Sequence, residues 1–279
     1  MTKTAEGTAN TRVGFVGLGS QGAPMARRII DAGYETTLWA RRAESLEPFA
    51  GSGAGVATSP STLGEASDVL CVCVVDDAGV EAVLRGPDGA LSSISAGSIV
   101  AVHSTVHVDT CRRLAADFPH LEIVDAPVSG GGHQAAIGEL VVMVGGADEA
   151  VGRCRPIFET FGDPVLHLGD VGAGQLAKIL NNALFTAQLG LAAEVFELAG
   201  ARGLDLGAMG RIIGTGSGRS FAAELVTGAG YSLVDLAPIA GPLLAKDVGL
   251  LADDVELGDS ALLDAAAASV RRMGITDDD

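Results

Sequence analysis

A glycine-rich turn between a short apolar strand and a helix constrains the fold of this chain more than any other feature. The apolar segment 12–16 predicts the strand, the turn follows at once, and segment 23–30 has the pattern of a helix. A G-x-G-x-x-G turn in this position is typical of a dinucleotide-binding βαβ unit, in which the helix N-terminus supplies N–H donors to a pyrophosphate. A glycine-rich turn without a ligand is the alternative, which the position between strand and helix disfavours. We therefore expect six turn residues to bind a cofactor: Gly17, Leu18, Gly19, Ser20, Gln21 and Gly22.

The end of the second predicted strand, residues 35–40, indicates which dinucleotide is bound. NAD enzymes usually carry Asp or Glu there, about 20 residues after the glycines, to bind the ribose hydroxyls. Here Ala40 is followed by Arg41 and Arg42. Because no carboxylate repels a 2′-phosphate and two guanidinium groups are available to bind one, the sequence favours NADP. The alternative is that the arginines form a solvated loop and that both NADP and NAD are accepted.

Strand and helix patterns alternate over the first 168 residues. Further strands are predicted at 68–75, 98–102, 121–125, 140–144 and 164–168, and further helices at 78–84, 109–117 and 148–160. This alternation predicts an α/β fold, a Rossmann-type doubly wound parallel sheet that binds its ligands at the carboxyl ends of the strands. Val75, Ser104 and Thr105 lie at such ends.

Beyond residue 169 no strand is convincing. Helices are predicted at 172–202, 205–214, 218–226, 241–256 and 260–273. We therefore expect two domains, a dinucleotide-binding domain over residues 1–168 and an all-helical substrate and dimerisation domain over residues 169–279. Because these helices are rich in Ala and Leu, the second domain is predicted to bury surface against a second copy of the chain.

The first of these helices carries a lone lysine among apolar residues. Lys178 and Asn182 are four residues apart and project from one helical face. One interpretation is a surface lysine whose stem covers apolar neighbours while its amine reaches water. The other, which this segment alone supports equally, is a catalytic amine with a companion amide.

A second glycine-rich segment directly follows the predicted strand that ends at Asp125. The hydroxyl of Ser129 and the successive backbone N–H groups of Gly130 and Gly131 are suited to a small anion-binding nest. A loop whose glycines only permit sharp turning is equally compatible with this segment.

Composition limits the possible partners and compartments. The formal net charge of −17 argues against nucleic-acid binding through a basic surface. Segment 1–10 lacks the apolar core of a signal peptide, and polar residues interrupt the apolar run 176–200, so neither secretion nor a membrane span is predicted. Cys71 and Cys73 lie in a predicted buried strand and make a poor metal clip or disulfide. We expect reduced thiols, no metal and a cytoplasmic location.

Five segments match one family in order and spacing, and the chain resembles the beta-hydroxyacid dehydrogenases. That family includes 3-hydroxyisobutyrate dehydrogenase and tartronate semialdehyde reductase and has a 6-phosphogluconate dehydrogenase-like fold. The matching segments are the turn and helix at 17–26, Ser104-Thr105, the segment 125–131, the helix start at 172–182, and Lys246-Asp247.

The resemblance implies a role for each of these segments. Lys178 would be the acid/base, Asn182 its hydrogen-bonding companion, and Ser129 with the two glycines that follow it the substrate carboxylate site. Additional cofactor contacts are implied for four residues: Val74, Val75, Thr105 and Lys246. Dimers or tetramers are implied as well.

Some positions depart from the family pattern. Ser20-Gln21 replaces the usual Asn-Met or Ile-Met, Val75 replaces a common Pro, and Ile239 stands about where an aromatic side chain often lines the substrate pocket. These departures leave the chemistry unchanged and the substrate open. We expect hydride transfer between NADP, or NAD, and a small 3-hydroxy acid or its semialdehyde. An NADPH-dependent imine reductase on the same scaffold, whose relatives usually lack the lysine, and a non-catalytic dinucleotide-binding assembly module are the alternatives.

Overall fold

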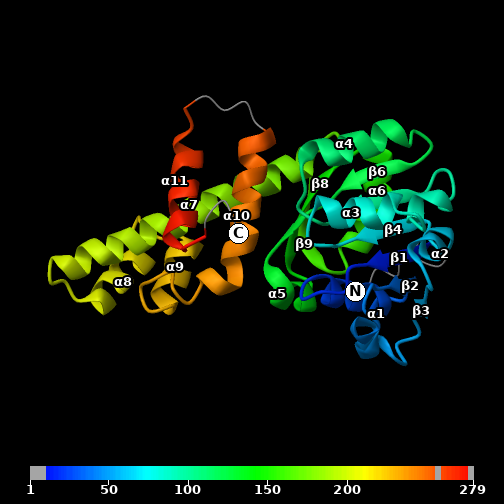
Figure 1. Cartoon of the computed structure of the whole chain (residues 1–279). Helices are drawn as coiled ribbons and strands as arrows, with labels where there is room; N and C mark the ends of the chain where they lie inside the picture. Colours follow the sequence, from blue (N-terminus) through cyan, green and yellow to red (C-terminus); the bar gives the residue numbers. More distant parts are fainter. Residues whose placement is uncertain (1–10, 255–258, 276–279) are drawn as a thin grey trace. The chain divides into compact units, whose positions relative to one another are not determined.

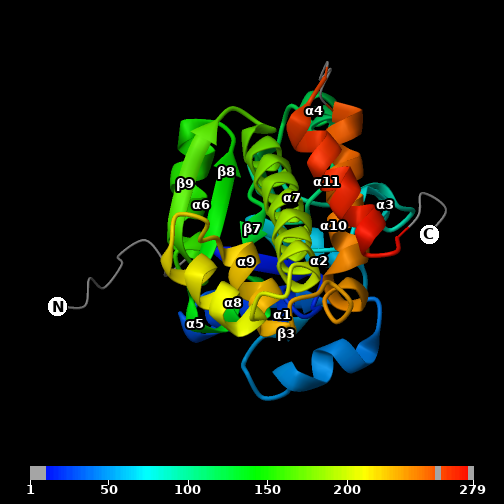
Figure 2. The same ribbon diagram turned by 90° about the vertical axis from the view of Figure 1, so that its left-hand side faces the viewer.

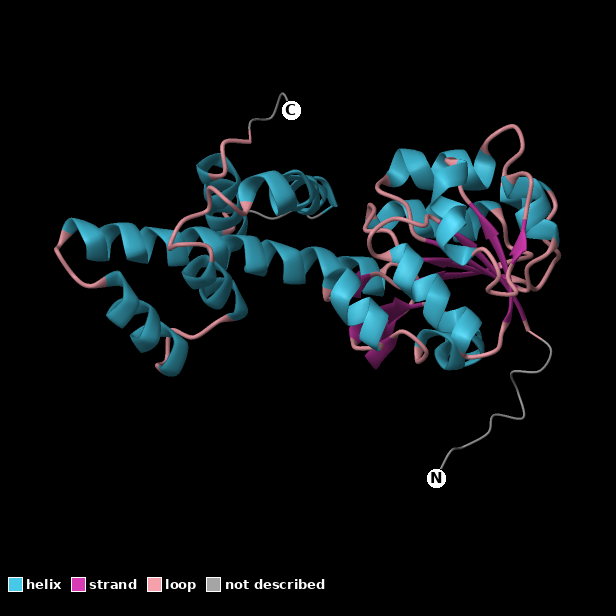
Figure 3. Cartoon of the chain, turned by 90° about the horizontal axis from the view of Figure 1, so that it is seen from below, coloured by secondary structure: helices cyan, strands magenta, loops and turns pink. Residues whose placement is uncertain are grey.

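The computed structural model describes residues 11–254 and 259–275 of the 279-residue chain, which divides after Lys178 into two compact units. The polar segment 1–10, on which the signal-peptide prediction rests, lies outside the described residues. All described strands belong to the first unit, and the regular structure described in the second is helical (Figure 3). The division falls inside a helix, whereas the predicted domain limit at 168/169 marks the change from strands to helices; that limit stays a prediction.

One nine-stranded sheet forms the centre of the first unit (Figure 1). Its strands in spatial order are β3 (Gly55–Val56), β2 (Glu35–Trp39), β1 (Arg12–Val16), β4 (Val69–Val72), β5 (Ile99–Val102), β6 (Glu122–Asp125), β8 (Leu140–Gly145) and β7 (Val128–Ser129), with β9 (Gly162–Gly169) paired to β8. The pairs from β3 to β6 are all parallel. This order is that of doubly wound dinucleotide-binding sheets, so the predicted Rossmann-type fold is confirmed.

The far end of the sheet differs from the parallel arrangement that the sequence predicts. β8 is antiparallel to both β6 and β7, and β9 is parallel to β8. A parallel crossover needs a dozen or more residues, and only residues 130–139 connect β7 to β8. The chain therefore reverses here, and the complete sheet is mixed.

Helices cover both faces of this sheet. They are α1 (Gly22–Asp31), α2 (Pro60–Glu65), α3 (Asp77–Arg85), α4 (Val108–Asp117), α5 (Gly131–Ile137) and α6 (Asp148–Phe158), with 3-10 helices η1 (Ala43–Phe49) and η2 (Ala90–Ser92). Alternate strand residues point to opposite faces. Phe15 accordingly packs in the apolar cluster that includes α1 and α6, and its neighbour Val16 packs in the cluster that includes α2, α3 and α4. Because both faces are buried, the parallel strands have nearly continuous apolar sequences.

The second unit is a helical assembly. Its helices are α7 (Ala173–Ala201), which begins in the first unit, α8 (Leu206–Thr215), α9 (Phe221–Gly228), α10 (Ala237–Asp254) and α11 (Ala261–Arg272). Figures 1 and 2 both show α10 and α11 side by side, in agreement with their contacts. The core of this unit joins Phe196 of α7, Val226 of α9 and Leu244 of α10.

The length and hydropathy of α7 correct the expectation that its interrupting polar residues make it too polar for a membrane span. This 29-residue helix contains an 18-residue window with a mean hydropathy of 1.2. By length and composition alone, the helix is therefore long and apolar enough to cross a membrane. The polar residues that interrupt it are outweighed in the average by Leu, Ala and Ile. Half of the window is buried inside the protein, as in the core helix of a globular domain.

Candidate active site

The glycine-rich turn between β1 and α1 has two glycines that packing within the protein requires and one, Gly19, that packing does not. Gly17 has φ = 96°, and a Cβ atom there would overlap the carbonyl oxygen of Cys73. A Cβ atom at Gly22 would overlap the carbonyl oxygen of Gly17. At Gly19, by contrast, a Cβ atom would meet nothing within 4 Å. The open side of the turn therefore lies at Gly19, where the fingerprint requires the close approach of a pyrophosphate.

The N-terminus of α1 is suited to bind that anion. Gln21, the residue before the helix, makes no side-chain capping hydrogen bond, and the first turn contains no acidic residue. Leu18 is buried, whereas Ser20 is exposed. An uncapped helix N-terminus carries unsatisfied N–H groups and a partial positive charge, which a phosphate satisfies.

Arg41 and Arg42 lie where β2 ends. Both are exposed, and within the described part of the chain neither guanidinium group has a hydrogen bond or an ion pair. Two unpaired positive charges at this strand end fit a 2′-phosphate.

A side-chain hydrogen bond connects the segments that follow β4 and β5. The Val74 N–H group donates to Ser104 Oγ at 2.8 Å. Val75 has an exposed fraction of 68% and Thr105 is half-buried. These predicted cofactor contacts thus lie at neighbouring strand ends on the edge of the sheet that binds ligands in this fold.

Segment 129–132 is more regular than the predicted loop. Ser129 ends β7, and α5 begins at Gly131 because Gly130 (φ = 135°) and Gly131 (φ = 75°) turn the chain. In the described part of the chain the Ser129 hydroxyl has no hydrogen-bond partner, and both glycines are exposed. A Cβ atom at Gly132 would overlap the carbonyl oxygen of Ser20, so the structure brings this segment against the cofactor turn.

Lys178, the last residue of the first unit, is buried, with 9% of its surface exposed. The turn of α7 that precedes it is held by two residues that lie in the matching segments 125–131 and 172–182 but to which the sequence analysis gave no role of their own. Asp125, at the end of β6, accepts hydrogen bonds from the N–H groups of Gly172 at 2.6 Å and Gln175 at 2.7 Å. The Gln175 side chain donates through Nε2 to the carbonyl oxygen of Ser104 at 2.8 Å. Because these contacts join residues that are distant in sequence, no local pattern could reveal them.

Asp125 is fully buried. Burial raises the pKa of its carboxyl group, and the N–H groups of Gly172 and Gln175 act in the opposite direction. Hydrogen bonds from the start of a helix, where negative charge is favoured, thus offset part of the cost of burying this carboxyl group.

In the second unit, Asp247 brings two predicted site residues together. Its Oδ2 accepts a hydrogen bond from Asn182 Nδ2 at 2.5 Å, and its Oδ1 lies 2.8 Å from Lys246 Nζ. Asn181 Nδ2 donates to Asn182 Oδ1 at 3.2 Å. The expected partnership of Asn182 with Lys178, one helical turn earlier, stays a prediction.

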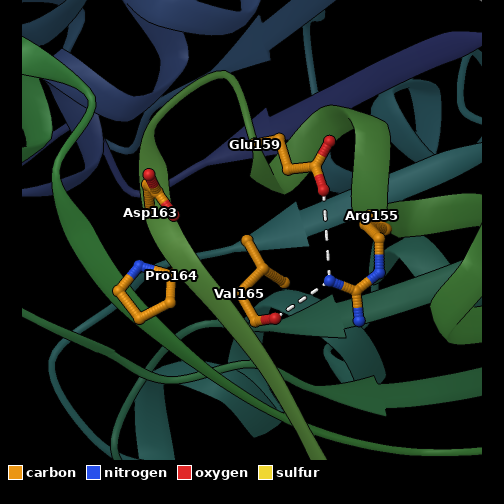
Figure 4. Close-up of a pocket in the computed structure, with 6 residues that line it drawn as sticks. Arg155, Glu159, Asp163, Pro164 and Val165 are labelled. Carbon is orange, nitrogen blue, oxygen red and sulfur yellow. Dashed lines mark hydrogen bonds and ion pairs between the residues drawn. The ribbon is translucent and has the colours of Figure 1, made fainter.

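A surface pocket of about 420 Å³ lies elsewhere in the first unit (Figure 4). It is lined by Arg155, Glu159, Gly162, Asp163, Pro164 and Val165. Arg155 Nη1 donates to the carbonyl oxygen of Val165 at 2.9 Å and lies 4.0 Å from Glu159 Oε1, so Arg155 and Glu159 are already paired with each other. None of the predicted site residues lines this pocket. Among the described residues, no three His, Cys, Asp or Glu side chains group as metal ligands.

Comparison with known proteins identifies relatives of both parts of the chain. Residues 12–169 match the family model of the NAD binding domain of 6-phosphogluconate dehydrogenase, and residues 172–273 match that of the NAD-binding region of NADP-dependent 3-hydroxyisobutyrate dehydrogenase. An uncharacterized oxidoreductase of Mycobacterium tuberculosis is 42% identical over 204 residues, which cover 72% of this chain and 69% of the relative. An NAD-dependent L-serine dehydrogenase of Pseudomonas aeruginosa is 33% identical and covers 94% of this chain and 91% of its own.

Solved structures agree with these matches. The 3-hydroxyisobutyrate dehydrogenase of Mycobacterium tuberculosis, solved with L-serine, has a TM-score of 0.82 at 28% identity and covers 94% of this chain and 93% of its own. A protein called Psf3, solved in complex with NADP+, has a TM-score of 0.81 at 29% identity. The match covers 93% of this chain and 92% of Psf3. An imine reductase of a Pseudomonas species is only 19% identical, with a TM-score of 0.63. The match covers 95% of this chain and 100% of the reductase, and it shows a shared fold alone.

The strand order and the open glycine turn define a dinucleotide-binding protein with a helical second region, and the match to an NAD binding domain makes the dinucleotide a nicotinamide one. With both family models matched in order along it, the chain belongs to the beta-hydroxyacid dehydrogenase family.

Proposed function

We propose that this protein is an NAD(P)-dependent oxidoreductase that transfers a hydride between the nicotinamide and a small 3-hydroxy acid or its semialdehyde. The observation that carries this proposal is the buried Lys178, one turn beyond a helix start that is hydrogen-bonded to the ends of β5 and β6. Ligands of doubly wound sheets bind at that edge. An amine at this place is suited to exchange a proton with the hydroxyl or carbonyl oxygen of a bound substrate.

The division of work among the residues follows from their chemistry. The bound cofactor supplies or accepts the hydride. Lys178 takes the hydroxyl proton during oxidation and donates one during reduction, and Asn182 orients the oxygen or the amine. Ser129, with the exposed N–H groups of Gly130 and Gly131, binds the substrate carboxylate. The Ser129 hydroxyl, which has no hydrogen-bond partner among the residues that the structure describes, supports this assignment.

For the cofactor, we infer a preference for NADP. The guanidinium groups of Arg41 and Arg42, which have no partner among the described residues, support it, because a 2′-phosphate would neutralise them. One relative is named NAD-dependent and one solved structure contains NADP+, so the relatives by themselves favour neither cofactor.

The imine reductase alternative is less well supported. Lys178 is present, whereas a reductase of imines on this scaffold usually lacks the lysine, and the imine reductases share the fold alone. A non-catalytic assembly module would need neither this lysine nor the Ser129 segment.

We also propose that the protein is a cytoplasmic homodimer or homotetramer. An apolar stripe along α7 supports association, because its large side chains are exposed in the single chain. The stripe consists of Leu180, Leu184, Leu191, Val195 and Leu198. All four cysteines are free thiols, and burial raises the pKa of each of them, which suits a reducing compartment.

A substrate panel tests the function. Small 3-hydroxy acids, including 3-hydroxyisobutyrate and L-serine, are assayed with NADP+ and with NAD+, beside matched alcohols without the carboxylate; the semialdehydes and cyclic imines are assayed with the reduced cofactors. We expect turnover of at least one acid and a strong preference over its alcohol, since the alcohol leaves the carboxylate site unpaired at a cost of about 1–3 kcal/mol. Turnover of imines without turnover of any acid or semialdehyde would favour the imine reductase.

A further inference from the structure

The start of α7 has an unusual cap. A helix is normally capped by a residue next to it in sequence, whose side chain accepts from the first free N–H groups. Here the acceptor is Asp125, which lies 47 residues before Gly172 and 50 before Gln175. A local cap moves with its own helix, whereas a cap supplied by the last residue of β6 ties the helix to the sheet.

Gln175 makes a second connection, from α7 to the segment that follows the neighbouring strand β5. Its Nε2 donates to the carbonyl oxygen of Ser104 at 2.8 Å, and its Oε1 accepts from the N–H group of Val106 at 3.1 Å. The side chain is fully buried. The amide nitrogen and the amide oxygen of Gln175 thus bind the backbone on either side of Thr105, which lies between Ser104 and Val106.

The glycines of this segment are explained by close packing. Gly172 has φ = 99°, and a Cβ atom there would lie 2.7 Å from Val108 Cγ1. A Cβ atom at Gly174 would overlap the carbonyl oxygen of Met143 and lie 2.9 Å from Asp125 Oδ2. The first turn of α7 therefore sits directly on the sheet edge, with no room for a methyl group.

Lys178 follows Gln175 by three residues, which is about 4.5 Å along the helix axis and on nearly the same face. A displacement of the first turn of α7 therefore displaces the lysine by almost the same distance. Misplacing a reacting group by about 1 Å can cost about 100-fold in rate.

We propose that Asp125 and Gln175 are positioning residues that hold the first turn of α7, and with it the Lys178 amine, against the ends of β5 and β6. This inference rests on the proposed role of Lys178 as the acid/base. Neither residue touches the reacting atoms in this scheme; both act through the lysine.

Asp125→Asn tests the first tie. The variant keeps the size of the side chain but presents an amide N–H₂ group to one of the two N–H donors, so one hydrogen bond is lost. We expect kcat for the best 3-hydroxy acid to fall about 10- to 100-fold, while KM for the acid and Kd for the cofactor stay within about threefold. Gln175→Met, which removes both side-chain bonds at similar volume, is expected to lower kcat in the same way. It decides the question if Asp125→Asn fails to fold.

The combination with Lys178→Ala separates positioning from simple stabilisation. If the two residues act through the lysine, Asp125→Asn and Gln175→Met lower kcat no further in the Lys178→Ala background. Asp205→Ala is the matched control. Asp205 caps α8 locally by accepting from the Ala208 N–H group at 2.6 Å, so its loss should lower Tm and leave kcat unchanged.

Two results would overturn the inference. One is a folded Asp125→Asn or Gln175→Met enzyme with a lower Tm but kcat within about twofold of the unmodified protein, as expected for the control. The other is a loss of kcat that multiplies with the loss caused by Lys178→Ala. A Lys178→Ala enzyme with unchanged kcat would refute the proposed function together with the inference, whereas the first two results leave the proposed function intact.

Discussion

Cofactor choice is the property that a single side chain tests most simply in this protein. Arg41→Ala removes one of the two exposed guanidinium groups at the end of β2. We expect NADP+ binding to weaken by about 1.5–3 kcal/mol, the worth of a charge-assisted hydrogen bond, and NAD+ binding to change little. Titration calorimetry with both cofactors measures the two effects. Arg219→Ala, an exposed arginine of the second unit, is the control and should change neither. Equal weakening of both cofactors would mean that Arg41 does not contact the 2′-phosphate.

Among single residues, the sequence nominates as site candidates those that belong to contiguous motifs. Lys178, Ser129 and the fingerprint glycines are recognisable because local spacing defines them. Asp125 and Gln175 were missed as partners, because a hydrogen bond across 50 residues leaves no local pattern. Only the fold reveals such contacts.

At the scale of the secondary-structure element, the turn between β1 and α1 allows a glycine with a structural role, Gly22, to be distinguished from one with a role in cofactor binding, Gly19. Gly22→Ala should lower the stability of the protein, because the new methyl group would overlap the carbonyl oxygen of Gly17. Gly19→Ala should leave Tm nearly unchanged, since its methyl group would point into open space, but should weaken cofactor binding by about tenfold or more because it blocks the pyrophosphate. Thermal unfolding with and without cofactor measures both. A Gly19→Ala protein with undiminished cofactor affinity would contradict the assignment of this turn.

Long, strongly patterned elements were predicted well from sequence. Apart from β3, the strands of the parallel part of the sheet and the helix α7 were placed within a few residues of their observed ends. β3 and β7 have two residues each, too few to show a period of two, and were missed. The helix α5 was missed because its glycine-rich start resembles a loop.

For the whole molecule, one buried histidine predicts how stability depends on pH. His103 is enclosed by Phe15, Phe158 and Phe161, its Nδ1 lies 2.8 Å from the carbonyl oxygen of Ala126, and burial lowers its pKa from 6.5 to about 4. Between these values the unfolded chain binds more protons than the folded one, so stability is lost as pH falls. We expect the free energy of unfolding to be about 2 kcal/mol lower at pH 5 than at pH 7.5 through this residue alone.

Urea unfolding of the unmodified protein and of His103→Gln at the two pH values isolates this contribution. Asp125 acts in the opposite direction, because its raised pKa makes the folded state bind more protons as the pH falls toward the ordinary range of a carboxyl group. The difference between the two proteins removes that contribution. If both proteins lose the same stability on acidification, His103 does not titrate as the structure implies.

The proton transfer assigned to Lys178 is tested most directly by the rate of hydride transfer in a single turnover. The enzyme is saturated with cofactor and mixed with the best 3-hydroxy acid of the panel, and reduced nicotinamide is followed in the unmodified protein, in Lys178→Ala and in Lys178→Arg, which keeps the charge but cannot release a proton. We predict that both variants bind the cofactor normally and transfer hydride about 100 to 10,000 times more slowly, the usual worth of a general acid/base. A Lys178→Ala enzyme that keeps more than about a tenth of the original rate would contradict the central role of this lysine.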